Sequence, residues 1–365
     1  MSPRRIVPGL AVLAVLGSAC GGSHGVRSLR FAAPSDYPVA PNPTNVAVAD
    51  FDGDGTPDVA TTSEDGSVLS VLLGRTDGTL AGVQRIPTPK GGSFVLAADV
   101  NGDGQVDLVE ATHHGVVAVL LGHGDGTFGR PRSYPVGTDT WWVAGADLNA
   151  DGSPDLIAAD YGSGTLAILF GNSDGTFRKA VHYPDPNCVS VTAADLNRDG
   201  QPDLVTADFD STVRVFEGSP SGELGKPQGF AIGGAGVAVV AGDLNGDDRR
   251  DLLVGDDAAG SVEVLLQRPN GAFRVARKLA AGNTHSVAIA DLNADGHPDL
   301  AAGGYDEPFV RVWLGSGDGH FGSLRKLPVG RDGARGVAFA DLNSDGKLDV
   351  VATDAKRHVA VALGR

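Results

Sequence analysis

The chain has 365 residues and a formal net charge of −16 at pH 7, so it has room for one large domain or two smaller ones. The sequence shows no basic surface that could bind the phosphate backbone of a nucleic acid, and this disfavours nucleic-acid binding. Glycine is abundant at 53 residues, but it falls at regular turn positions and forms no low-complexity block.

Residues 1–20 are typical of an export signal. Arg4 and Arg5 supply a positive start, and the apolar run from Ile6 to Leu16 is too short to span a bilayer. The segment Gly17–Cys20 resembles a bacterial lipobox, although Gly17 stands where that motif usually has Leu. We therefore expect lipidation at Cys20, with ordinary cleavage after Ala19 as the alternative.

The glycine-rich residues 21–27 suit a flexible tether between such an anchor and a folded domain. The sequence thus predicts an exported, membrane-anchored lipoprotein of the bacterial cell envelope. The membrane leaflet is left open.

Residues 28–365 consist of one unit repeated seven times, and its most regular part is a nine-residue acidic loop. In the first loop, Asp50 to Asp58, acidic residues occupy positions 1, 3, 5 and 9, and a glycine occupies position 6. This spacing is typical of a Ca²⁺ loop, because Ca²⁺ takes six to eight oxygen ligands and the glycine permits the sharp turn. The loop recurs at intervals of 48 to 50 residues.

The candidate Ca²⁺ ligands at positions 1, 3, 5, 7 and 9 are as follows. Acidic loop one has Asp50, Asp52, Asp54, Thr56 and Asp58; loop two has Asp99, Asn101, Asp103, Gln105 and Asp107; loop three has Asp147, Asn149, Asp151, Ser153 and Asp155. Loop four has Asp195, Asn197, Asp199, Gln201 and Asp203; loop five has Asp243, Asn245, Asp247, Arg249 and Asp251. Loop six has Asp291, Asn293, Asp295, His297 and Asp299; loop seven has Asp341, Asn343, Asp345, Lys347 and Asp349.

The residue type at position 7 varies freely. This is expected if the ligand at that position is the backbone carbonyl oxygen, which every residue has. We therefore expect up to seven structural Ca²⁺ ions. The fifth loop is the exception, because Asp248 replaces the glycine at position 6. The alternative is that all the loops are metal-free Asx turns.

The rest of each unit predicts four antiparallel strands, named A to D in chain order. A valine lies four residues before each acidic loop, two apolar strands follow the loop, and an Asp-Gly or Asn-Gly hairpin turn precedes strand D in most units. Helical periodicity is absent. Units of this kind predict an all-β, seven-bladed β-propeller. The last unit lacks strand D, so we expect the N-terminal strand to complete that blade.

These loops and spacings resemble the FG-GAP (VCBS-type) repeat family, whose fold is the propeller of the integrin alpha-chain head. The resemblance covers residues 28–365 and implies that the loop carboxylates bind Ca²⁺. The family includes adhesion heads, sugar-binding propellers and non-catalytic modules of enzymes, so the fold alone does not decide the function.

The sequence offers no catalytic motif, so no catalytic residues are predicted and the chain is not expected to be an enzyme. His113 and His114 are adjacent and are not expected to converge on one ion, and Cys188 is expected to be an inert, partly buried thiol. Arg331 and Arg335 are the nearest candidates for the cation that a polysaccharide lyase needs.

The A–B and C–D loops of a blade share one face, so the acidic loops should all lie on it. We expect a ligand on the opposite, calcium-free face over blades three and four, at Trp141, Trp142, Tyr161 and Phe209. The leading function is a calcium-stabilised, non-catalytic binding or adhesion propeller with a protein or glycan ligand. The alternatives are a lectin-like glycan-binding propeller and, less favoured, a polysaccharide lyase or hydrolase.

Overall fold

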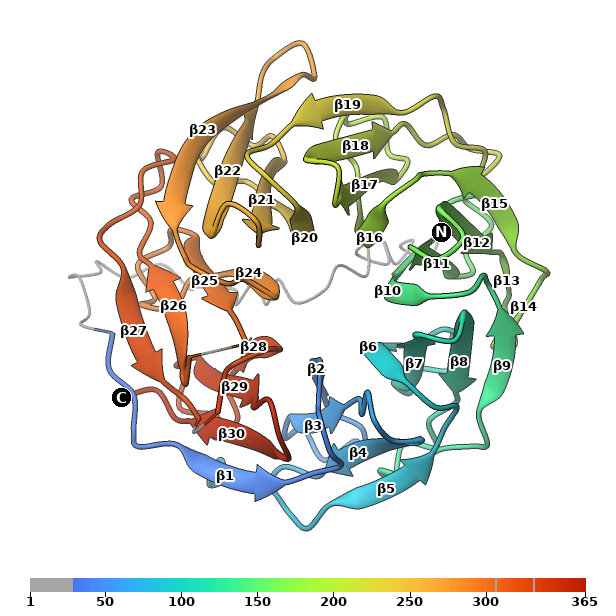
Figure 1. Cartoon of the computed structure of the whole chain (residues 1–365). Helices are drawn as coiled ribbons and strands as arrows, with labels where there is room; N and C mark the ends of the chain where they lie inside the picture. Colours follow the sequence, from blue (N-terminus) through green and yellow to red (C-terminus); the bar gives the residue numbers. More distant parts are fainter. Residues whose placement is uncertain (1–28, 306, 331) are drawn as a thin grey trace, which may run out of the picture.

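The described residues form seven four-stranded antiparallel sheets arranged as the blades of a propeller (Figure 1). This computed structural model describes residues 29–305, 307–330 and 332–365, and no helix occurs among them. Within that part of the chain there is consequently no helix long and apolar enough to cross a membrane. The predicted fold is confirmed. The predicted export signal, the tether, Cys20 and Arg331 lie outside the described residues.

The strands of each blade run in order from the axis of the ring to its circumference (Figure 1). The A strands at the axis are β2 (Val46–Ala49), β6 (Gly92–Ala98), β10 (Thr140–Ala146), β16 (Cys188–Ala194), β20 (Gly236–Gly242), β24 (Ser286–Ala290) and β28 (Val337–Ala340). The B strands are β3 (Asp58–Thr61), β7 (Asp107–Thr112), β11 (Asp155–Asp160), β17 (Asp203–Asp208), β21 (Asp251–Asp256), β25 (Asp299–Gly303) and β29 (Asp349–Thr353). The C strands are β4 (Val68–Leu72), β8 (Val116–Leu120), β12 (Thr165–Leu169), β18 (Thr212–Phe216), β22 (Ser261–Gln267), β26 (Phe309–Trp313) and β30 (His358–Ala362). The outer D strands are β5 (Gln84–Pro87), β9 (Arg132–Pro135), β15 (Val181–Pro184), β19 (Gln228–Ala231), β23 (Phe273–Ala280), β27 (Arg325–Pro328) and β1 (Ser35–Pro38). Blade three adds a short hairpin, β13 (Gly171–Asn172) with β14 (Thr176–Phe177).

The two ends of the described chain meet in the seventh blade, as predicted. Strand β1 pairs antiparallel with β30, so that Ser35 lies opposite Val361 and Pro38 opposite His358. This pairing gives blade seven its outer strand and closes the ring. Strand β30 is therefore not left as an unpaired edge at the seam.

Burial falls from the middle of each blade to its outer edge. Every residue of β11 is buried, whereas β15 has three exposed residues and one half-buried residue. Small and β-branched residues suit the B strand, because neighbouring blades cover both of its faces. The hydrophobic core therefore lies between blades.

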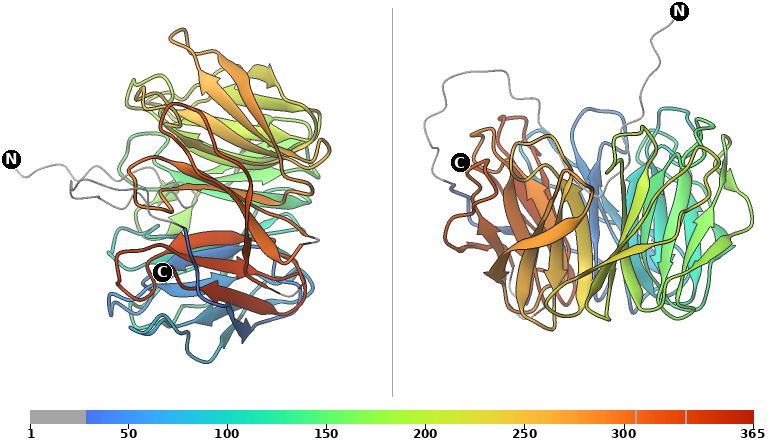
Figure 2. Two further views of the ribbon diagram at one scale, coloured as in Figure 1. Left: turned by 90° about the vertical axis from the view of Figure 1, so that its left-hand side faces the viewer. Right: turned by 90° about the horizontal axis from the view of Figure 1, so that it is seen from above.

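The acidic loops and the C–D hairpins lie on one face of the ring, and the B–C and D–A loops lie on the other. The backbone N–H of Gly126, in the C–D turn of blade two, donates a 3.0 Å hydrogen bond to the carbonyl of Phe51 in acidic loop one. Figure 2 shows the strands running between the two faces. We call these the acidic face and the opposite face.

Candidate functional site

Each acidic loop is a chain of Asx turns built from its own carboxylates. In loop one, Asp50 Oδ1 accepts a hydrogen bond from the N–H of Gly53 (2.8 Å), and Asp50 Oδ2 accepts one from Gly55 (2.9 Å). The carboxylates at positions 3 and 5 accept bonds from the N–H groups two residues later, at Asp54 and Thr56. The backbone alone therefore gathers these oxygens into one small region.

The aspartate at position 9 is buried and ties the loop to the rest of its blade. Asp58 Oδ2 accepts the N–H of Phe51 (2.7 Å), and Oδ1 accepts the N–H of Gly74 after strand C (2.6 Å). Burial raises the pKa of Asp58 to about 6 despite these bonds, and the charges of Asp52 and Asp50 raise it further. The same arrangement recurs in the other six loops, and the pKa of Asp299 reaches about 7.

Loop one has the donor set and the size that Ca²⁺ needs. One oxygen each of Asp50, Asp52 and Asp58 lies within 4.8 Å of the others. Two oxygens on opposite sides of a Ca²⁺ ion stand about 4.6–5.2 Å apart, since each bond is 2.3–2.6 Å long. Crowded carboxylates, one of which has a raised pKa, fit a divalent cation, which would compensate their repulsion.

Loop five differs, because its own side chains supply a cation. The guanidinium of Arg249, at position 7, hydrogen-bonds to the carboxylate of Asp247 at position 5, and its Nε donates to the carbonyl of Gln267 (3.2 Å). Asp248 takes the left-handed conformation with φ of 63° that glycine adopts at this position in the other loops. In loop seven, Lys347 Nζ lies 3.4 Å from Asp345 Oδ2, but it is more exposed. The residues of loop five therefore fit Ca²⁺ less well.

The opposite face carries a cavity of about 610 Å³ at the axis of the ring, and every blade contributes to its wall. The wall combines aromatic, acidic, basic and imidazole side chains. Its residues are Thr44, Glu64, Asp65, Lys90, Gly91, Ser93, His113, His114, Asp139, Trp141, Trp142, Phe209, Val237, Asp257, Thr284, His285, Tyr305 and Arg335. This variety contrasts with the uniform acidic loops.

A β-bulge gives the two adjacent tryptophans at the cavity different environments. The register passes from Thr140 opposite Asp160 to Trp142 opposite Ala159, so Trp141 is the extra residue. Trp142 is only 7% exposed and stacks on Phe94, with ring centroids 4.0 Å apart. Trp141 is half-buried and remains partly open to solvent.

Trp141 forms an aromatic cluster with Tyr161 and Phe209, which come from the B–C loops of blades three and four. Its ring centroid lies 6.0 Å from that of Tyr161 and 5.5 Å from that of Phe209, and Tyr161 and Phe209 are 5.3 Å apart. Asp139 holds this cluster, because it accepts a hydrogen bond from Trp141 Nε1 (3.1 Å) and pairs with His113 Nδ1 (2.7 Å).

A second cluster of side chains lies on the part of the cavity wall formed by blades six, seven and one. The guanidinium of Arg335 stacks over the ring of Tyr305 at 4.5 Å and bonds to Glu64 Oε2 at 3.2 Å. The ring of His285 meets that of Tyr305 edge-on at 4.7 Å. Burial lowers the pKa of His285 to about 3, and the charge of Arg335 acts in the same direction. His285 is therefore neutral at pH 7.

Comparison with known families identifies the repeat. A model described as FG-GAP-like repeat matches residues 50–110, 99–158, 147–206, 195–254, 243–302 and 291–352. This chain belongs to the FG-GAP-like repeat family. Each match begins at the first aspartate of an acidic loop, and the last extends past loop seven.

Solved structures similar to this FG-GAP-like chain show the same fold. BBS1N in complex with ARL6DN gives a TM-score of 0.66 at 12% identity, over 93% of this chain and 98% of that one. A lectin of Agrocybe aegerita that recognises non-reducing terminal N-acetylglucosamine gives a TM-score of 0.55 at 21% identity, over 78% of this chain and 80% of the lectin. No curated protein matches the sequence.

The structure brings all four residues predicted for the ligand patch of this FG-GAP-like propeller to the cavity or beside it. Trp141 and Phe209 line the cavity, and Tyr161 contacts both from outside it. Trp142 is a packing residue beside them. Their role in binding stays a prediction. Sequence reasoning missed Asp139 and the group of His285 and Tyr305, since nothing local connects residues so far apart in the chain.

Proposed function

We propose that this FG-GAP-like propeller is a non-catalytic binding protein that holds a ligand in the cavity of its opposite face. The observation that carries the proposal is the cavity itself. Ligand sites are typically concavities of about 300–1,000 Å³ with aromatic walls and a few convergent polar groups. A cavity of about 610 Å³ that includes Trp141, Phe209 and Asp139 has this composition.

Of the two ligand classes, the cavity favours a glycan over a protein. The half-buried ring of Trp141 offers an apolar surface, and Asp139 and His113 place hydrogen-bonding groups beside it. Sugars present an apolar face and a ring of hydroxyls, which these groups complement. The Agrocybe aegerita lectin supports the proposal, because a related fold there recognises a sugar.

We further propose that Ca²⁺ in the acidic loops stabilises the propeller, and that the chain is held on the bacterial envelope through Cys20. The crowded oxygens of loop one support the first part, and the residue pattern before Cys20 supports the second. Cys20→Ser should move the protein from the membrane fraction to the soluble fraction. A wild-type protein that is already soluble would contradict the anchor.

A glycan-array screen with and without Ca²⁺, followed by titration of the best glycan, tests the binding function. Trp141→Ala should weaken binding at least tenfold with little change in melting temperature, because the ring is half-buried. Tyr183→Ala on outer strand β15 is the control and should leave the affinity unchanged. Binding that survives Trp141→Ala, Tyr161→Ala and Phe209→Ala would show that the site lies elsewhere. If no glycan on the array binds but a protein does, the ligand is a protein.

One observation favours a second candidate, a polysaccharide lyase. A lyase needs a neutral base beside a cation that balances the substrate's carboxylate, and the cavity holds neutral His285 near Arg335. Glu64 already pairs with Arg335, however, and offsets its charge. Unsaturated sugar products from uronic-acid polysaccharides, lost on His285→Gln, would establish this activity over simple binding.

A further inference from the structure

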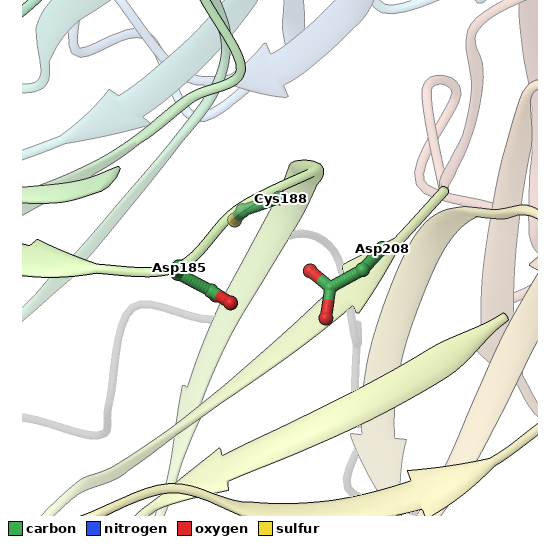
Figure 3. Close-up of side chains that lie close together, drawn as sticks. All are labelled: Asp185, Cys188 and Asp208. Atoms are coloured by element: carbon green, nitrogen blue, oxygen red, sulfur yellow. The ribbon is translucent and has the colours of Figure 1, made fainter. Parts of the chain in front are cut away.

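Two carboxylates and a thiol that belong neither to the acidic loops nor to the wall of the cavity meet inside the propeller. Asp185 lies in the D–A loop that connects blade three to blade four, Cys188 begins strand β16, and Asp208 ends strand β17. One oxygen of each carboxylate and the sulfur of Cys188 lie within 4.8 Å of one another. Figure 3 shows the three side chains directed toward a common centre. All three residues are fully buried.

Comparison of the seven blades shows that the fold does not require a carboxylate at position 185. The first residue after each D strand donates its N–H to a carbonyl in the B–C loop of the same blade, at 2.7–3.1 Å, and is buried. In the other six blades this residue is Val39, Thr88, Val136, Ile232, Ala281 or Val329. Asp185 makes the same backbone bond but places a carboxyl group where the other blades have uncharged side chains. Such burial is costly unless a partner compensates it.

The protein supplies only part of that compensation. The guanidinium of Arg214 bonds to Asp208 Oδ2 and lies 3.4 Å from Asp185 Oδ1, but it also pairs with Asp210 at 2.5 Å. The Thr206 hydroxyl and the Cys188 thiol lie close enough to Asp185 to lower its pKa, but burial outweighs them. Among the described residues, neither group makes a hydrogen bond of normal geometry to the Asp185 oxygens, and Oδ1 of Asp208 also lacks one.

The equivalent aspartate of blade three shows what full compensation looks like. Asp160 accepts hydrogen bonds from the N–H groups of Thr138 and Ser163 and from the hydroxyl of Thr140. Cys188 occupies the place of Thr140, since each pairs with the last aspartate of its B strand. Blade four has therefore exchanged hydrogen-bond donors for a thiol and a second carboxyl group, both of which are metal ligands.

We propose that Asp185, Cys188 and Asp208 bind one divalent transition-metal ion of the zinc type. Thiolate with carboxylate selects zinc-like ions over Ca²⁺, which prefers oxygen alone. In a tetrahedral site with bonds of about 2.0–2.3 Å, ligand atoms stand ~3.3–3.8 Å apart, so small side-chain movements complete it. Arg214 holds Asp208 through Oδ2, which leaves Oδ1 of Asp208 as the available ligand atom.

Metal binding displaces the thiol proton of Cys188 to solvent. Burial, together with the charges of Asp185 and Asp208, raises the pKa of Cys188 well above its usual value, so the metal-free residue is a neutral thiol. A cation reverses the effect of burial by replacing the proton. Because Phe209 follows Asp208, an ion here also fixes the loop that carries one member of the aromatic cluster.

Cobalt titration of the full chain carrying Cys20→Ser tests the proposal, since Cys188 is then its only thiol. In excess Ca²⁺, which saturates oxygen-only sites, Co²⁺ should produce a thiolate-to-cobalt charge-transfer band that saturates at one equivalent and disappears when Zn²⁺ is added. Asp185→Val, which restores the residue of blade two, should reduce the Co²⁺ affinity at least 100-fold. Glu223→Gln, at an exposed position in the C–D turn of blade four, is the control and should change nothing.

Stability measurements keep the test decisive if a variant folds poorly. Zn²⁺ should raise the melting temperature of the parent chain and leave that of Asp185→Val unchanged. Metal-free Asp185→Val should be at least as stable as the metal-free parent, because it removes a buried carboxyl group. If it does not fold, Cys188→Thr provides the same comparison. A folded parent with no charge-transfer band, or a band that persists in Asp185→Val, would overturn the proposal and leave a proton-sharing carboxyl pair as the explanation.

Discussion

At the scale of the residue, buried acidic side chains are the feature of this propeller that ordinary packing explains least. Glu110 lies in strand β7, opposite Val95 and Ala118, and is 1% exposed. A methyl group on Gly92 would lie 2.3 Å from its Oε1, so the glycine provides the space that the carboxyl group occupies. Burial raises the pKa of Glu110 to about 8, against a smaller opposing effect of Thr88. Glu110 is therefore mostly protonated at neutral pH.

Glu110→Gln should remove a specific pH dependence of stability. The pKa of Glu110 is higher in the folded chain than its usual value of 4.5, so its stabilising effect is complete below pH 4.5 and is lost as pH rises toward 8. Between pH 5 and pH 8, the free energy of unfolding of the wild type should fall relative to Glu110→Gln by up to about 1.4 kcal/mol per pH unit. Urea denaturation at several pH values in excess Ca²⁺ measures this. Glu217→Gln, at an exposed position, is the control, and parallel wild-type and Glu110→Gln profiles would refute the prediction.

At the scale of the element, the sequence predicts whatever repeats and misses whatever occurs once. The acidic loops and the four-strand unit were predictable, because aspartates and valines recur at a fixed spacing. Position 4 of every loop has positive φ, yet it holds residues as different as Gly53, Arg198 and Ser344, so no residue type marks it. The bulge at Trp141 recurs in blades two, four and five, but no single residue type marks its extra position either. The carboxylate at Asp185 occurs once and was hidden for that reason.

Replacing the first aspartate of a loop should affect Ca²⁺ binding in loop one but not in loop five. In loop five the guanidinium of Arg249 already bonds to Asp247, so its positive charge would repel a Ca²⁺ ion. Asp50→Asn should therefore lower the Ca²⁺ stoichiometry in equilibrium dialysis by one, whereas Asp243→Asn should leave it unchanged. An equal loss in both variants would show that loop five binds Ca²⁺ and that Arg249 moves aside.

At the scale of the whole molecule, the acidic loops connect each blade to the next. The C–D turn of one blade lies against position 3 of the preceding blade's loop, as Gly78 does against Asn343, Gly175 against Asn101, and Gly222 against Asn149. The pairing of Gly78 with Asn343 continues this pattern across the seam between blades seven and one. Because the ring is closed by the pairing of β1 with β30, loosening one loop also affects the interface with its neighbour.

Removal of Ca²⁺ should consequently destabilise the entire ring. An ion that binds only the folded state adds about 2.7 kcal/mol per site at a hundredfold excess over its Kd, and these sites lie at the junctions between blades. A chelator should lower the melting temperature markedly. Ca²⁺ should restore it better than Mg²⁺, because Mg²⁺ requires a near-ideal octahedral site with short bonds, whereas Ca²⁺ accepts varied geometry and six to eight oxygen ligands. Addition of the Ca²⁺-saturated chelator is the control and should have no effect. An unchanged melting curve in free chelator would mean that the Asx turns hold the loops unaided, since their backbone N–H groups already satisfy most of the carboxylate oxygens.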